Sequence, residues 1–124
     1  MHWLAVALGG ALGAMARYAI VLYTLPVITH RFPVATLTAN IVGSLLIGAV
    51  YVLVVEKAVL GEQARLFLMT GFLGALTTFS TFALESLTLF QNGYSGMAVI
   101  YLFTSVTCCL LAVWLGYTLT FRLI

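Results

Sequence analysis

Charged residues are scarce in this sequence. Its 124 residues include five Lys or Arg and three acidic residues, all of them glutamate, so that only 6% of the chain is charged. Soluble domains carry roughly 25% charged residues, and this composition excludes a soluble globular domain. Hydrophobic residues make up 64% of the chain, and the mean hydropathy is +1.19. The composition therefore predicts an integral membrane protein.

Groups that carry enzyme chemistry are also lacking. The chain has no aspartate, no glycine-rich phosphate loop with a lysine, and no set of Ser, His and acid that could form a triad. His2 and His30 stand near the ends of apolar segments without a second ligand group, so neither predicts a metal site. There is no basic cluster for nucleic acid either. We expect neither an enzyme nor a nucleic-acid-binding protein.

The only two cysteines, Cys108 and Cys109, are neighbours in the sequence. A disulfide between them would be strained, and the spaced Cys or His partners of a zinc site are absent. We interpret both as small apolar helix residues, which indicate no redox compartment.

Four long apolar runs occupy most of the chain, at roughly residues 3–25, 34–55, 65–90 and 97–121. Each exceeds the about 18 residues that a transmembrane helix needs. The first lacks the basic start and the short apolar core of a signal peptide, so we expect it to remain as a helix. Pro26 and the turn at residues 30–33 close it. The sequence predicts one all-α transmembrane domain, residues 1–124, with four helices.

The basic residues do not favour one orientation in the membrane. Lys57, Arg65 and Arg122 fall on the side of the N-terminus, whereas Arg17 and Arg31 fall towards the other side. Three against two is a weak bias, and a chain of this kind could insert both ways up. That behaviour would suit an antiparallel dimer.

The third apolar run contains an unusual stretch at residues 71–82. It combines two glycines with four hydroxyl residues, Thr77, Thr78, Ser80 and Thr81. Glycine and hydroxyl residues both weaken a helix, and a break inside a membrane brings carbonyl groups and partial charges to mid-membrane. An unbroken helix whose small residues pack against its neighbours explains the same residues equally well. The residues alone leave both interpretations open.

Polar residues repeat every four positions on two other helices. The second run carries Thr36, Asn40 and Ser44 beside a small-residue stripe of Ala35, Ala39 and Gly43, and the fourth carries Tyr101, Ser105 and Cys109. For the second run we favour a pathway lined by neutral hydrogen-bonding groups. The alternatives are an interhelical hydrogen bond from Asn40 and, on the fourth run, hydroxyls that bond back to their own helix.

Two charged residues fall within or near the spans. Arg17 follows the small residues Ala5, Gly9 and Gly13 on one helix face, which predicts close approach of another helix. We expect Arg17 to face protein or a water-filled vestibule, with snorkelling to the headgroups as the alternative. Glu85 is the only acid within a span, and is either an intramembrane group with a partner or a residue near the surface.

Residues 71–82, read as Gly-Phe-Leu-Gly-Ala-Leu-Thr-Thr-Phe-Ser-Thr-Phe, resemble the signature of the fluoride channels called Fluc or CrcB. The segments at residues 9–18 and 36–44, the length and the four spans agree with that family. Ala75 departs from it, because many members have a second glycine there.

The resemblance implies a passive fluoride channel that exports fluoride through two pores of an antiparallel, dual-topology homodimer. It implies a structural sodium ion held by the backbone carbonyls of Gly74 and Thr77 from both subunits. It also implies that the protein lies in the lipid of a prokaryotic plasma membrane, which is the inner membrane in a Gram-negative cell. The resemblance places these residues at the pore: Asn40, Phe79, Phe82, Ser80, Thr81, Thr36, Ser105, Arg17 and Glu85. Cys109 falls on the same polar track, where a thiol is a weaker donor.

Two other classes have to be weighed against the channel. A small four-helix, proton-coupled multidrug transporter needs a membrane carboxylate in its first helix, and the first run here has no acid. A non-transporting assembly subunit would leave the polar columns and the glycine-rich stretch unexplained.

Overall fold

The computed structural model describes residues 1–25 and 31–124. Pro26 and His30 lie outside the described residues. The elements that position the site are α1 (His2–Thr24), α2 (Val34–Tyr51) with the wide π-helical segment η2 (Val52–Glu56), and α6 (Ser95–Leu123). Between them, one interrupted helix is built from α3 (Glu62–Arg65), the π-helical η3 (Leu66–Leu73), α4 (Gly74–Leu76) and α5 (Phe79–Gln91).

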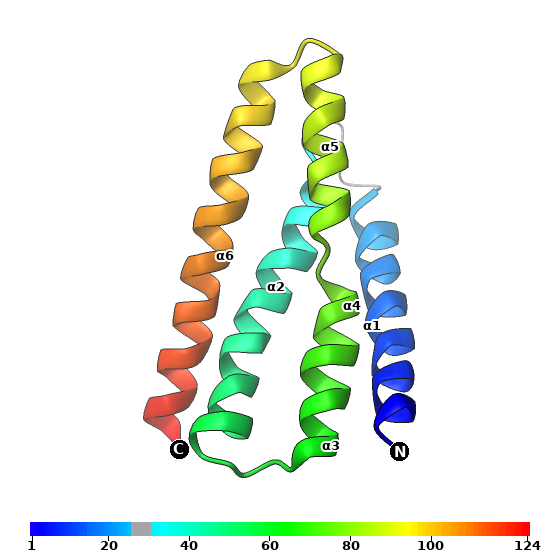
Figure 1. Ribbon diagram of the computed structural model, residues 1–124. Helices are drawn as coiled ribbons and strands as arrows, with labels where there is room; N and C mark the ends of the chain where they lie inside the picture. The colour runs from blue at the N-terminus through cyan, green and yellow to red at the C-terminus, as the bar shows by residue number, and fades with distance from the viewer. Residues whose placement is uncertain (26–30) are drawn as a thin grey trace.

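Four helical segments of the described chain are long and apolar enough to cross a membrane: His2–Thr24, Val34–Glu56, Glu62–Gln91 and Ser95–Leu123. They run side by side, with both termini and the loop after η2 at one end (Figure 1). The turn between α5 and α6 lies at the other end, where Gly93 has a φ of +82°. This arrangement is that of a multi-pass membrane protein.

Glycines bring α1 close to the interrupted helix. Gly9 and Gly13 are buried, and a Cβ on either would collide with a backbone carbonyl, that of Phe67 or of Phe72. Gly71 faces them, since a Cβ there would lie 2.8 Å from the Val6 carbonyl oxygen. In lipid the hydrophobic effect does not drive helices together, and close backbone approach supplies van der Waals contact instead. The predicted small-residue face of the first helix is confirmed.

A second close contact joins α2 to α6. A Cβ on Gly48 would collide with the Val113 carbonyl, and one on Gly116 would collide with the Leu45 carbonyl. On the expected small-residue stripe of α2, Ala39 is buried and Gly43 lies against the side chain of Thr77. The molecule is thus two close helix pairs, α1 with the interrupted helix and α2 with α6.

The third span is broken, and the break lies at residues 77–78. Thr77 has φ −84° and ψ 154°, and Thr78 has φ −150° and ψ 117°, so both are extended. Of the two interpretations of residues 71–82, the broken helix is confirmed, but the break falls on the hydroxyl residues, and the helix passes through both Gly71 and Gly74. Gly71 instead serves the close approach of α1. No sequence pattern predicted the π-helical turns of η2 and η3.

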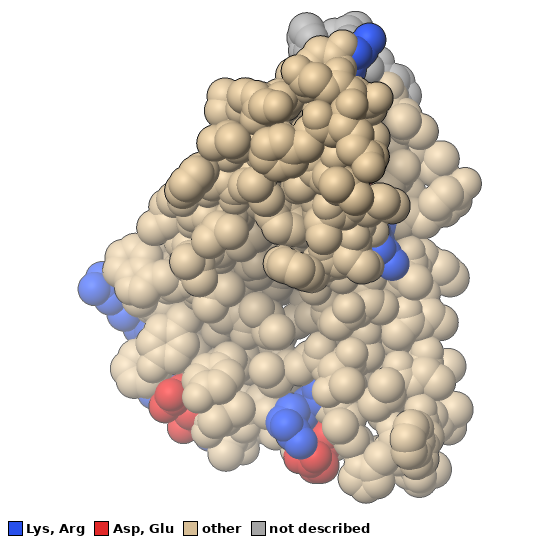
Figure 2. All heavy atoms as spheres, turned by 45° about the horizontal axis from the view of Figure 1, so that its top comes forward, with Lys and Arg blue, Asp and Glu red and all other residues tan. Residues whose placement is uncertain are grey.

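The outer surface is largely uncharged. On the face in Figure 2, most charged side chains lie towards the end that holds the termini, and uncharged residues cover the rest. Large apolar side chains are exposed along the spans, among them Phe79, Phe103 and Leu110. Such a surface suits lipid or another protein chain rather than water.

Candidate functional site at the helix break

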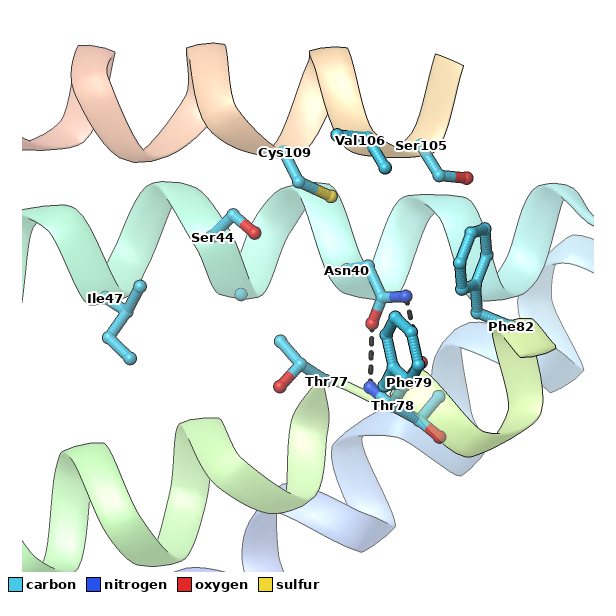
Figure 3. Close-up of a pocket in the computed structure, with 11 residues that line it drawn as sticks. Asn40, Ser44, Ile47, Thr77, Thr78, Phe79, Phe82, Ser105, Val106 and Cys109 are labelled. Carbon is cyan, nitrogen blue, oxygen red and sulfur yellow. Dashed lines mark hydrogen bonds between the residues drawn. The ribbon is translucent and has the colours of Figure 1, made fainter. Parts of the chain in front are cut away.

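The break in the third span is held by Asn40 from α2. Its Nδ2 donates to the backbone carbonyl oxygen of Thr78 at 3.1 Å, and its Oδ1 accepts from the Thr78 backbone N–H at 2.8 Å. Both bonds appear as dashed lines in Figure 3. One amide side chain therefore pairs with both the N–H and the carbonyl of Thr78, the backbone groups that the interruption leaves free. A helix break inside a membrane requires such pairing.

Thr78 also starts the second half-helix. Its Oγ1 accepts from the Thr81 N–H at 3.2 Å, which is an N-cap of α5, and it donates to the Thr81 Oγ1 at 3.0 Å. In an unbroken helix the amides of Thr78 and Thr81 would donate to the carbonyls of Gly74 and Thr77. Here both amides donate to side chains instead. The carbonyls of Gly74 and Thr77 are thus released from helical pairing.

A pocket of about 360 Å³ opens beside the break. Residues of α2, the break, α5 and α6 contribute to it (Figure 3). The lining residues are Asn40, Gly43, Ser44, Ile47, Thr77, Thr78, Phe79, Phe82, Ser105, Val106 and Cys109. All of these are uncharged, and they include an amide, several hydroxyls and two aromatic rings.

Ser105 on α6 is one of the residues that line the pocket. The residue is 5% exposed, and its Oγ is buried without a hydrogen bond in the described part of the chain. The Phe79 and Phe82 rings lie 5.5 Å apart between centroids, with Phe82 buried and Phe79 77% exposed. A free hydroxyl and the positive edges of phenylalanine rings are groups that stabilise an anion without a fixed charge.

A second polar cluster lies next to Phe82. Glu85 Oε1 accepts from the Thr36 hydroxyl and Glu85 Oε2 accepts from the Tyr101 hydroxyl, each at 2.7 Å. Tyr101 is completely buried, and its ring centroid is 5.1 Å from that of Phe82. Glu85 therefore has the partners expected of a functional group, one on α2 and one on α6. Tyr101 belongs to the polar column expected on the fourth run, but no sequence pattern predicted that it would bind Glu85.

A family described as "CrcB-like protein, Camphor Resistance (CrcB)" matches residues 4–117. This chain belongs to that family. A relative from Saccharophagus degradans is 51% identical over 98% of this chain and 91% of its own length. One from Hahella chejuensis is 49% identical over 96% and 94%, and one from Acidobacterium capsulatum is 43% identical over 100% and 99%. All three relatives carry the name "Fluoride-specific ion channel FluC".

The residues that the sequence predicted for the CrcB pore fall into three groups in the structure. Asn40, Phe79, Phe82 and Ser105 line the pocket, together with Thr77 and Cys109. Thr36 and Glu85 form the neighbouring cluster with Tyr101. Ser80, Thr81 and Arg17 are not among the residues that line the pocket in this chain: Ser80 is exposed, Thr81 bonds to Thr78, and Arg17 is half-buried on α1.

The polar stripe of α2 does not form one continuous track. Thr36 bonds to Glu85, Asn40 bonds to the break, and Ser44 lies in the pocket. Of the two interpretations of Asn40, hydrogen bonding to another segment of the bundle is confirmed, and pathway lining stays a prediction. Its amide bonds to another helix and also lines the pocket.

Proposed function

We propose that this chain is a passive fluoride channel. The observation that carries the proposal is a pocket beside the helix break whose lining carries no charge and includes the Asn40 amide, several hydroxyl residues and two phenylalanine rings. The names of the relatives supply the identity of the ion. Neither the multidrug transporter nor the assembly subunit is favoured by any observation.

Fluoride is small and strongly hydrated, so a narrow pore has to replace its water with hydrogen-bond donors and positive ring edges. Ser105, the second N–H of Asn40 and the edges of Phe79 and Phe82 supply such groups. Conduction also requires that the ion can leave, and donors without a fixed positive charge avoid a deep trap. Ser80 and Thr81 would lie beside this route, the cluster of Thr36, Glu85 and Tyr101 would hold Phe82 in place next to it, and Arg17 would draw the anion to the mouth.

We infer that two copies pack in opposite orientations and enclose two pores. Phe79 and Gly74 lie at the middle of a span and are nevertheless exposed in the single chain, which leaves half of a site open. A second, inverted copy would cover them. The nearly even distribution of Lys and Arg over the two ends is compatible with insertion in both orientations.

The same face can hold a structural sodium ion. The Gly74 and Thr77 carbonyls are released from helical pairing, and carbonyl oxygens are ligands that suit a hard cation. Gly74 is exposed, so its carbonyl can meet that of an inverted copy. The ion would neutralise the carbonyl end of α4 in each of the two copies and would join their two helix breaks.

The channel would serve export from the cytoplasm across a prokaryotic plasma membrane, the inner membrane in a Gram-negative cell. A potential that is negative inside drives an anion outward by about 2.3 kcal/mol per 100 mV, so no energy source is needed.

Fluoride efflux from proteoliposomes tests this function. Liposomes loaded with potassium fluoride should empty once valinomycin provides a path for potassium, and chloride-loaded liposomes should retain their anion. Equal rates for the two anions, or efflux that depends on a proton gradient, would show that the chain is not a passive fluoride channel.

A further inference from the structure

Asn40 and Gly43 lie three residues apart on α2 and contact the two residues of the helix break. Asn40 bonds to both backbone groups of Thr78. Gly43 lies against Thr77, and a Cβ added to Gly43 would overlap with the Thr77 methyl group, Cγ2. The next nearest atoms, Thr77 Cβ and Leu76 Cδ2, are each 3.7 Å from that position, which is ordinary van der Waals contact. The space that Gly43 leaves empty is therefore filled by one methyl group.

The other branch of the Thr77 side chain is also held. Thr77 Oγ1 donates to the Leu73 carbonyl oxygen at 2.9 Å, and the Thr77 backbone N–H donates to the same oxygen at 3.1 Å. In Figure 3 the Thr77 hydroxyl points away from α2. Threonine has three staggered rotamers, so any rotation that moved the methyl group away from Gly43 would also move the hydroxyl away from Leu73. The rotamer of Thr77 is thus fixed from both sides.

We propose that Gly43 is a positioning residue for the helix break. It leaves room for the Thr77 methyl group, and the fixed side chain holds the Thr77 backbone, whose φ of −84° and ψ of 154° set the direction of the released carbonyl. The fit of Gly43 against Thr77 stands on the geometry of the chain. Its use, which is to aim the Thr77 carbonyl at a sodium ion, rests on the proposed function.

The contact between Gly43 and Thr77 can be tested by moving one methyl group. Gly43→Ala puts a methyl group where the Thr77 methyl group already lies, so Thr77 has to give up its bond to Leu73 or shift its backbone. Thr77→Ser removes the methyl group of Thr77 and keeps its hydroxyl. The double variant Gly43→Ala/Thr77→Ser therefore fills the same space once, from the other residue.

The experiment measures thermal unfolding in detergent for the unmodified chain, both single variants and the double variant. Sodium chloride is varied against N-methyl-D-glucamine chloride at constant ionic strength, because an ion that binds only the folded state raises its unfolding temperature. Gly43→Ala should need about tenfold or more sodium for half of the full rise. Thr77→Ser and the double variant should stay within about threefold of the unmodified chain. Gly10→Ala is the matched control and should not change the requirement, since a Cβ there meets nothing within 4 Å.

Two results would overturn the proposal. One is a Gly43→Ala variant with the sodium requirement of the unmodified chain, because Gly43 would then not position the carbonyl. The other is a double variant that needs as much sodium as Gly43→Ala, or that fails to fold while Thr77→Ser folds. In either case the overlap would not be with the Thr77 methyl group.

Sodium that stabilises none of these proteins, the unmodified chain included, would refute the proposed sodium site. The unfolding temperatures without sodium then decide the fit by themselves. A double variant that unfolds about 3 °C or more above Gly43→Ala supports the positioning of Thr77 by Gly43, and equal temperatures contradict it.

Discussion

At the scale of single residues, the two phenylalanines of the pocket differ in how much packing they provide. Phe82 is buried among Leu89, Ala98 and Tyr101, so a smaller side chain there alters the core as well as the pocket. Phe79 is 77% exposed and makes little contact within one chain. A loss of flux on substitution of Phe79 is therefore the cleaner sign of a role in the path.

We expect Phe79→Ile to leave the protein folded and to lower fluoride efflux by about tenfold or more, because the substitution removes a positive ring edge. Efflux per mole of folded protein, taken from size-exclusion chromatography, is the measurement. Phe103→Ile is the matched control, since Phe103 is 72% exposed on α6 and does not line the pocket. Equal efflux through both variants would remove Phe79 from the path.

Asn40 gives a second prediction, in which stability and flux are both affected. Asn40→Ala removes two hydrogen bonds to Thr78, and the unpaired backbone groups should cost about 1–3 kcal/mol each. Asn40→Asp keeps the acceptor for the Thr78 N–H but loses the donor to the Thr78 carbonyl. It should be destabilised less than Asn40→Ala, and its negative charge should still stop fluoride.

Thermal unfolding in detergent measures these differences, with Thr38→Ala as the control on the same helix. Thr38 makes no side-chain hydrogen bond in the described part of the structure. Should Asn40→Ala unfold at the same temperature as Thr38→Ala, Asn40 does not hold the break.

At the scale of elements, the packing of α1 on η3 depends on which glycine is replaced. A Cβ at Gly9 would collide with the Phe67 carbonyl, whereas one at Gly10 would have nothing within 4 Å. Gly9→Ala should therefore push the helices apart and destabilise the protein by about 1–3 kcal/mol.

Gly10→Ala is the matched control for that substitution and should be neutral or slightly stabilising, because alanine favours the helix. The yield of monodisperse protein and its thermal unfolding temperature compare the two variants. Equal behaviour would mean that α1 does not approach η3 as closely as the structure has it.

At the scale of the whole molecule, the proposed antiparallel dimer makes a prediction about orientation. Adding a few lysines beside the N-terminus should force one orientation, because basic residues remain in the cytoplasm. That variant should lose fluoride efflux when expressed alone and regain it with a variant biased the other way. Labelling of introduced cysteines from each side measures orientation, and a uniform orientation of the unmodified protein would contradict the dimer.

Hydropathy and local composition determined much of this protein from its sequence. The apolar runs predicted the four spanning helices, because the length of an apolar segment is compared directly with the thickness of a bilayer. The spacing of Gly9 and Gly13 predicted a close helix contact, since residues four apart share a helix face. The stretch at residues 71–82 was identified as a possible break on the weak helix preference of its glycines and hydroxyls.

Only the tertiary structure decided where the helix breaks and what holds it there. Gly71 is helical and lies against α1, and the interruption is at Thr77 and Thr78. The bonds from Asn40 to Thr78 and from Thr36 to Glu85 join residues 38 and 49 positions apart, and local sequence patterns carry no information on such pairs. Which buried polar group meets which partner depends on how the helices pack, and this packing fixed the geometry of the pocket.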